Sequence, residues 1–149
     1  MNIDLVYSGA NYLPSSSHSL TGWSDADWAS DIDTQRSIRS YIFHLDSSCI
    51  LSWRCQKQPV VVLSSIEAEY IAAATANKEL LWLQTMIQEL NFNLLQPSTL
   101  YCDNQSCIVL TLNPRFHDRS KHIDTRFHFL CEQITNKLLQ LEYTPTAQM

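Results

Sequence analysis

The feature that most constrains this fold is a change of hydrophobic period near residue 64. Before it, short segments are rich in β-branched and aromatic residues, as is typical of strands. Residues 64–67 then match a capping box, in which Ser64 caps a helix and Glu67 reaches back to its start. A run rich in Ala, Leu, Glu and Gln follows over residues 68–90. The chain is therefore expected to place strands first and a long helix after them.

The remaining elements follow from the same patterns. Strands are expected at 20–28, 41–45, 50–54, 99–102 and 138–143, and helices at 68–90, 104–112 and 123–136. The long run is expected to form two helices or one kinked helix, with the break at Asn77 and Lys78. Three meandering strands followed by alternating helices and strands imply an α/β fold with a mixed sheet and helices on its faces.

Composition narrows the class of protein. A chain of 149 residues with 45% hydrophobic and 17% charged residues is expected to form one globular domain. No apolar run approaches the roughly 18–20 residues of a membrane span, and no signal peptide is recognised. The net charge of −5 argues against a protein that coats nucleic acid, and two glycines exclude a glycine-rich phosphate loop. Five cysteines without close pairing favour a reduced, cytoplasmic setting. We also expect the chain to be a monomer.

Three acidic residues stand where metal chemistry would need them. Asp25 lies in the first regular strand, Glu69 lies five residues past the helix cap, and Asp103 ends a strand expected to be buried and parallel. Ligands of α/β sheets gather at the carboxyl ends of strands. Carboxylate oxygens are the ligands that Mg²⁺ prefers, and two such ions about 3.5–4 Å apart can drive phosphodiester hydrolysis.

The spacing of these acids leaves a simpler interpretation open. Asp25 fits a solvated acid at a strand end, and Glu69 fits a surface residue paired with a lysine. Asp103 fits a cap for the helix beginning at Asn104, a common role for aspartate.

Several separate motifs occur in one order along the chain. They are residues 22–29 (GWSDADWA), 52–54 (SWR), 57–61 (KQPVV), 63–72 (LSSIEAEYIA), 101–106 (YCDNQS) and 121–124 (KHID). Together they resemble the ribonuclease H domain of Ty1/copia-type retrotransposon Pol polyproteins, over roughly residues 20–149. The resemblance implies a ribonuclease H-like fold, with a five-stranded mixed sheet whose first three strands are antiparallel, flanked by helices. It also implies hydrolysis of the RNA strand of RNA–DNA hybrids during reverse transcription, with two Mg²⁺ ions or Mn²⁺.

The resemblance also implies residue roles. Asp25, Glu69 and Asp103 match the family's catalytic, metal-binding acids, whereas Glu67 is the competitor of Glu69 and is assigned to the helix cap. Residues expected to contact the hybrid are Gln105, Asn104, Ser65, Arg119 and Lys121. Simpler roles stay open: a helix cap for Asn104, a surface position for Gln105, and a solvated loop with a helix salt bridge for Arg119 and Lys121. For Ser65, the cap role of the neighbouring Ser64 is a sufficient explanation of the motif.

The resemblance breaks off at both ends. Residues 1–19 are expected to be a remnant of the connection to a reverse transcriptase, the partner domain of the intact polyprotein in a retroelement particle. The family's fourth metal-binding aspartate and its C-terminal helix have no counterpart before Met149. From this we expect weakened or lost activity. The alternative is a non-catalytic remnant that keeps the fold and binds nucleic acid weakly at most.

Overall fold

The computed structural model describes residues 17–31, 33–46, 49–112 and 121–148, without the side chains of residues 110, 121–127 and 148. Residues 1–16, most of the segment expected to connect to a reverse transcriptase, lie outside this description. Within the described part, no helix has both the length and the apolar character that crossing a bilayer requires.

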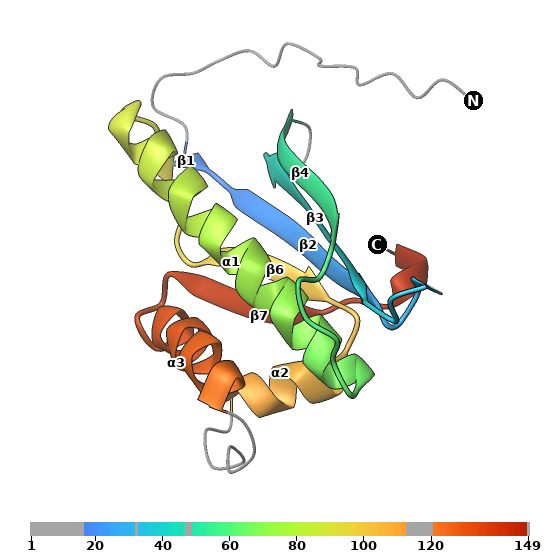
Figure 1. Cartoon of the computed structure of the whole chain (residues 1–149). Coiled ribbons are helices and arrows are strands. Elements are labelled where there is room, and N and C mark those ends of the chain that lie inside the picture. The colour runs from blue at the N-terminus through green and yellow to red at the C-terminus, as the bar shows by residue number, and fades with distance from the viewer. Residues whose placement is uncertain (1–16, 32, 47–48, 113–120, 149) are drawn as a thin grey trace, which may run out of the picture.

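A five-stranded mixed sheet organises the molecule (Figure 1). Its strands are β2 (Leu20–Asp27), β3 (Ile38–Leu45), β4 (Cys49–Lys57), β6 (Ser98–Cys102) and β7 (Leu139–Tyr143), in the order β4-β3-β2-β6-β7. The first three pair antiparallel, and β6 and β7 run parallel to β2. The expected mixed sheet is confirmed, with β3 and β4 longer than predicted.

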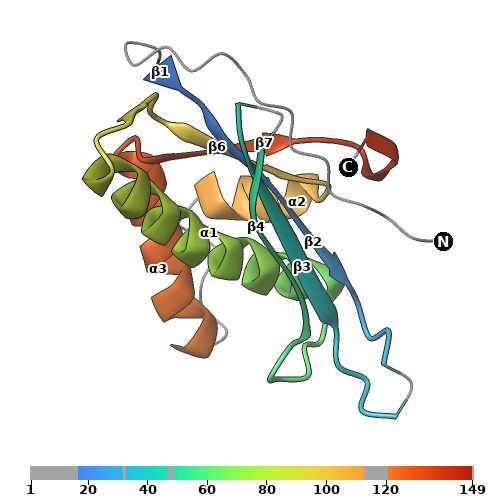
Figure 2. The ribbon, with the colours of Figure 1, turned by 90° about the horizontal axis from the view of Figure 1, so that it is seen from above.

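Three helices cover one face of this sheet. They are α1 (Ser65–Glu89), α2 (Gln105–Leu112) and α3 (Lys121–Thr135), and Figure 2 shows all three on the same side. A further two-stranded parallel pair, β1 (Ser17–His18) with β5 (Asn93–Leu94), joins the start of the described chain to the segment after α1. This short pair was not predicted, because two residues carry no periodicity.

Helix α1 begins as the capping box predicts. The backbone N–H of Glu67 donates to Ser64 Oγ at 3.2 Å, and Glu67 Oε2 accepts from the backbone N–H of Leu63 at 3.1 Å. The expected break at Asn77 is wrong, since α1 continues for 25 residues. Asn77 is fully buried, and tertiary packing outweighs the low helix propensity of asparagine.

The core lies between the sheet and α1. Alternate strand residues point to the helices, among them Leu20, Phe43 and Leu100, all at most 1% exposed. Gly22 lies opposite Phe43 on the neighbouring strand, and a Cβ atom at Gly22 would sit 2.3 Å from the Phe43 ring. The absence of a side chain at Gly22 therefore lets the Phe43 ring fill the core.

Candidate metal centre

Three carboxylates converge at one end of the sheet. Asp25 on β2, Glu69 on α1 and Asp103 just after β6 each offer an oxygen atom, and these atoms lie within 4.8 Å of one another. The three residues are 44 and 34 positions apart in sequence, so only the fold brings them together.

The register of β2 and β6 explains the position of the two aspartates. These parallel strands pair Trp23 with Tyr101, and the two aromatic rings stack with centroids 5.4 Å apart. Asp25 and Asp103 each follow two residues later. Because strand side chains alternate between faces, both carboxylates continue the face that carries the stacked rings, opposite the helices.

Glu69 reaches the same point from α1 on the helical side. Its Oε1 atom accepts a hydrogen bond from the backbone N–H of Ala26 at 3.2 Å. The pairing of β2 with β6 ends at Trp23, so β2 has an open edge at Ala26 that Glu69 occupies. The side chain is 5% exposed, which excludes the interpretation of Glu69 as a surface residue paired with a lysine.

The cluster is electrostatically strained without a cation. Burial, followed by the charges of Asp103 and Asp25, raises the pKa of Glu69 to about 8. Burial and the neighbouring Asp103 also raise the pKa of Asp25. In addition, Glu69 Oε2 is buried with no hydrogen-bond partner in the part of the chain that the structure describes. An all-oxygen donor set with an unsatisfied buried carboxylate oxygen fits a hard divalent cation such as Mg²⁺.

Thr146 joins the cluster from the end of the described chain. After β7, the backbone N–H of Thr144 donates to Cys102 O at 3.0 Å, which holds this segment beside the end of β6. Thr146 Oγ1 then donates to Asp103 Oδ2 at 2.5 Å. Sequence reasoning missed this residue, although the carboxyl ends of parallel strands share one edge, and that rule places the residues after β7 near Asp103.

Comparison of the sequence with known proteins identifies relatives of this chain. No protein-family model matches the sequence. The Pol polyprotein from transposon TNT 1-94 of Nicotiana tabacum is 42% identical over 122 residues, or 82% of this chain. The Pol polyprotein from transposon RE2 of Arabidopsis thaliana is 41% identical over 128 residues, or 86% of this chain. The chain is a homologue of copia-type Pol polyproteins. It spans 9% of the length of each of these two relatives.

Solved structures give the fold of this copia-type domain. The crystal structure of LC11-RNase H1 in complex with an RNA/DNA hybrid matches with a TM-score of 0.59 at 11% identity, over 87% of both chains. The foamy viral protease-reverse transcriptase in complex with an RNA/DNA hybrid matches with a TM-score of 0.55 at 11% identity. This match covers 98% of this chain and 20% of the viral one. The ribonuclease H-like fold expected from the sequence is confirmed.

Three of the residues predicted to contact substrate lie at the starts of helices. Ser65 is exposed at the first residue of α1, and Gln105 is exposed at the first residue of α2. Asn104 caps α2, since its Oδ1 accepts from the backbone N–H of Cys107 at 3.0 Å. Asn104 therefore fills the capping role that was considered for Asp103.

The side chains of the two basic residues predicted to contact substrate, Arg119 and Lys121, lie outside the described part of the structure. Arg119 lies outside the described residues. Lys121 is the first residue of α3, and its side chain lies outside the description as well.

Proposed function

We propose that this copia-type domain hydrolyses, with weakened activity, the RNA strand of RNA–DNA hybrids during reverse transcription, with two divalent ions, Mg²⁺ or Mn²⁺. The observation that carries the proposal is the convergence of Asp25, Glu69 and Asp103 within 4.8 Å, with one buried Glu69 oxygen left without a partner. Three carboxylates in this arrangement are costly in a folded protein unless a cation balances them.

Each residue has a distinct part in the proposed site. Asp25 and Asp103 present oxygens from the face of the sheet opposite the helices, and Glu69 presents its oxygens from α1, anchored by the amide of Ala26. Thr146 fixes the orientation of the Asp103 carboxylate through its hydroxyl group. When bound, the metal ions supply an activated water and stabilise charge on the leaving oxygen.

The proposed substrate contacts lie next to the acids in sequence. Ser65 and Gln105 begin the two helices that flank the cluster, and both are exposed. Side-chain hydroxyl and amide groups suit phosphate and 2′-hydroxyl groups of a hybrid. The proposal also keeps Asn104, Arg119 and Lys121 as substrate contacts.

Two fold relatives support the choice of substrate and partner. LC11-RNase H1 and the foamy viral enzyme were both solved with an RNA/DNA hybrid. In this proposal, residues 20–149 form the nuclease unit. Its partner is a reverse transcriptase domain of the same polyprotein. The two act inside an intracellular retroelement particle.

The test is cleavage of a hybrid whose RNA strand is labelled, in Mg²⁺ or Mn²⁺. RNA and DNA duplexes of the same sequence serve as control substrates. We expect cleavage of the hybrid's RNA strand only, abolished by EDTA and reduced at least about a hundredfold in Asp25→Asn and Asp103→Asn. A folded chain that cleaves nothing in either metal contradicts the proposal and leaves the non-catalytic interpretation.

A further inference from the structure

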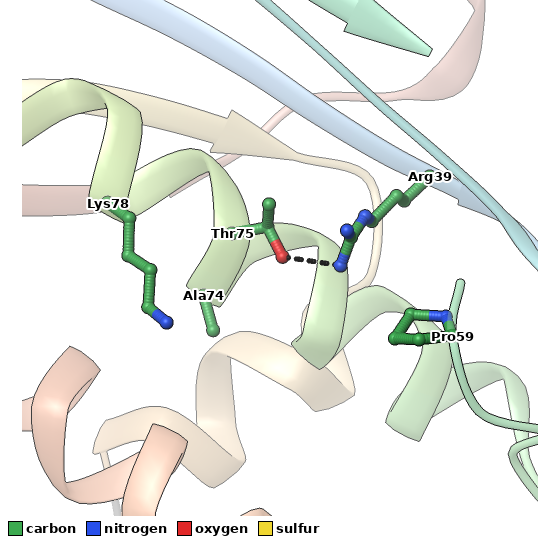
Figure 3. A pocket seen from close by; sticks show the side chains of 5 residues that line it. All are labelled: Arg39, Pro59, Ala74, Thr75 and Lys78. Atoms are coloured by element: carbon green, nitrogen blue, oxygen red, sulfur yellow. Dashed lines mark hydrogen bonds between the residues drawn. The ribbon is translucent and has the colours of Figure 1, made fainter. Parts of the chain in front are cut away.

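A hollow with two basic side chains lies on a different side of α1 from the carboxylates. It has a volume of about 290 Å³ and is lined by Arg39, Pro59, Ala74, Thr75 and Lys78 (Figure 3). Arg39 comes from β3, Pro59 from the segment after β4, and the other three from neighbouring turns of α1. Three separate parts of the chain therefore build one hollow.

The guanidinium group of Arg39 is held in a fixed orientation there. Arg39 Nη1 donates to Thr75 Oγ1 at 3.0 Å, and Nη2 donates to Gln56 Oε1 at 3.4 Å. The Thr75 hydroxyl is itself anchored, since it donates to Ile71 O at 2.7 Å. A guanidinium that is already oriented loses little conformational freedom when it binds an anion.

Lys78 adds a second positive charge at the rim. Its side chain is exposed, and in the described part of the chain Lys78 belongs to no ion pair. Its neighbour in sequence, Glu79, is instead bound by Ser52 Oγ at 2.6 Å on β4. None of the five residues that line the hollow is acidic. The residues that line the hollow therefore carry two positive charges and no negative charge, within a chain whose net charge is −5.

The hollow is separate from the candidate metal centre. Lys78 follows Glu69 by nine residues, and at 100° per residue the two side chains leave α1 in opposite directions. A phosphate group held by Asp25, Glu69 and Asp103 through metal ions cannot at the same time occupy the hollow at Arg39.

We propose that Arg39 and Lys78 form a binding site for a phosphate group in this hollow. Guanidinium and ammonium groups are the side chains that bind phosphate oxygens most strongly, and the volume holds a phosphate group with its remaining water. The phosphate group comes either from a nucleic-acid backbone or from a free phosphate compound. The site does not depend on the proposed nuclease activity, because it requires neither metal nor cleavage.

The first arm of the test uses inorganic phosphate. Amide and guanidinium resonances of the ¹⁵N-labelled chain are followed during titration at constant ionic strength, with EDTA present. We expect saturable shifts at Arg39, Thr75 and Lys78, and affinity reduced about tenfold in Lys78→Gln and Arg39→Gln. Lys137→Gln, which removes an exposed cation after α3, is the matched control and should bind as the wild type does.

The second arm measures binding of an RNA–DNA hybrid in EDTA over a range of salt concentrations. Lys78→Gln is compared with the wild type by the slope of log affinity against log salt concentration. A lower affinity of this variant for the hybrid, with a slope about one unit smaller, identifies a backbone phosphate as the ligand. An unchanged hybrid affinity together with the phosphate shifts identifies a free phosphate compound. Absent shifts at these residues, or equal affinities of Lys78→Gln and Lys137→Gln for phosphate, would overturn the proposal. Lys78 is exposed, so its variant carries the test even where Arg39→Gln fails to fold.

Discussion

Glu69 Oε1 accepts a hydrogen bond from the backbone N–H of Ala26 at 3.2 Å, and this bond joins α1 to the open edge of β2. It fixes one oxygen of the carboxylate and leaves Oε2 buried without a partner among the described residues. Asp25 lies one residue before Ala26, so the bond also sets how close the two acids come. The hydrogen bond itself lowers the pKa of Glu69, but burial and the charges of Asp103 and Asp25 outweigh it.

The metal-free protein should lose stability as the pH rises. The pKa of Glu69 is raised from its ordinary 4.5 to about 8, so the folded state retains a proton that the unfolded chain releases. The stabilising effect of that proton is complete below pH 4.5 and disappears as the pH rises through about 8. The slope is at most about 1.4 kcal/mol per pH unit for one proton.

Denaturant unfolding in EDTA at several pH values measures this dependence. Glu69→Gln should flatten the profile and be more stable than the wild type at pH above 8. Glu67→Gln is the matched control, because it removes the same charge two positions away and keeps an oxygen for the helix cap. A wild-type profile as flat as that of Glu69→Gln would contradict the electrostatic account.

Thr146 should contribute to metal affinity through Asp103. Thr146→Val keeps the side-chain shape and removes the hydroxyl that donates to Asp103 Oδ2. Loss of such an orienting partner is expected to weaken Mn²⁺ binding about tenfold, measured by calorimetry. Thr146→Ser, which retains the hydroxyl, should restore the affinity. Equal affinities in all three proteins would show that the hydrogen bond has no part in binding.

Gly22→Ala should destabilise the fold without touching the acids. The added Cβ atom would lie 2.3 Å from the Phe43 ring, which is fully buried and has little room to move. The expected cost is about 1–3 kcal/mol, seen as a lower denaturant midpoint. Thr21→Ala, at the next position and on the other face of β2, should cost much less. Equal losses in the two variants would argue against the close packing of Gly22 on Phe43.

The sequence was informative where local chemistry decides the structure. The capping box at Ser64 and Glu67 predicted the start of α1. Runs of β-branched, aromatic and apolar residues predicted the strands of the sheet, and alternation supported the last of them. Such signals need only near neighbours along the chain. The predicted break at Asn77 failed because burial of that residue against the rest of the molecule, which no local pattern reports, decides the course of the helix.

The candidate site was predictable only in part. The motifs around Asp25, Glu69 and Asp103 named the acids, but spacing alone left simpler roles open for each. The hydrogen bonds of Glu69 to Ala26 and of Thr146 to Asp103 span 43 residues each, and both depend on strand register. A pairing of that range has no signature in a single sequence.

The most direct measurement compares hybrid cleavage by the wild type, Glu69→Gln and Glu67→Gln in Mg²⁺ and in Mn²⁺. The account predicts that Glu67→Gln cleaves at a rate close to that of the wild type and that Glu69→Gln is slower by at least about a hundredfold. Equal rates in the two variants, or a loss confined to Glu67→Gln, would contradict the assignment of the metal centre to Asp25, Glu69 and Asp103.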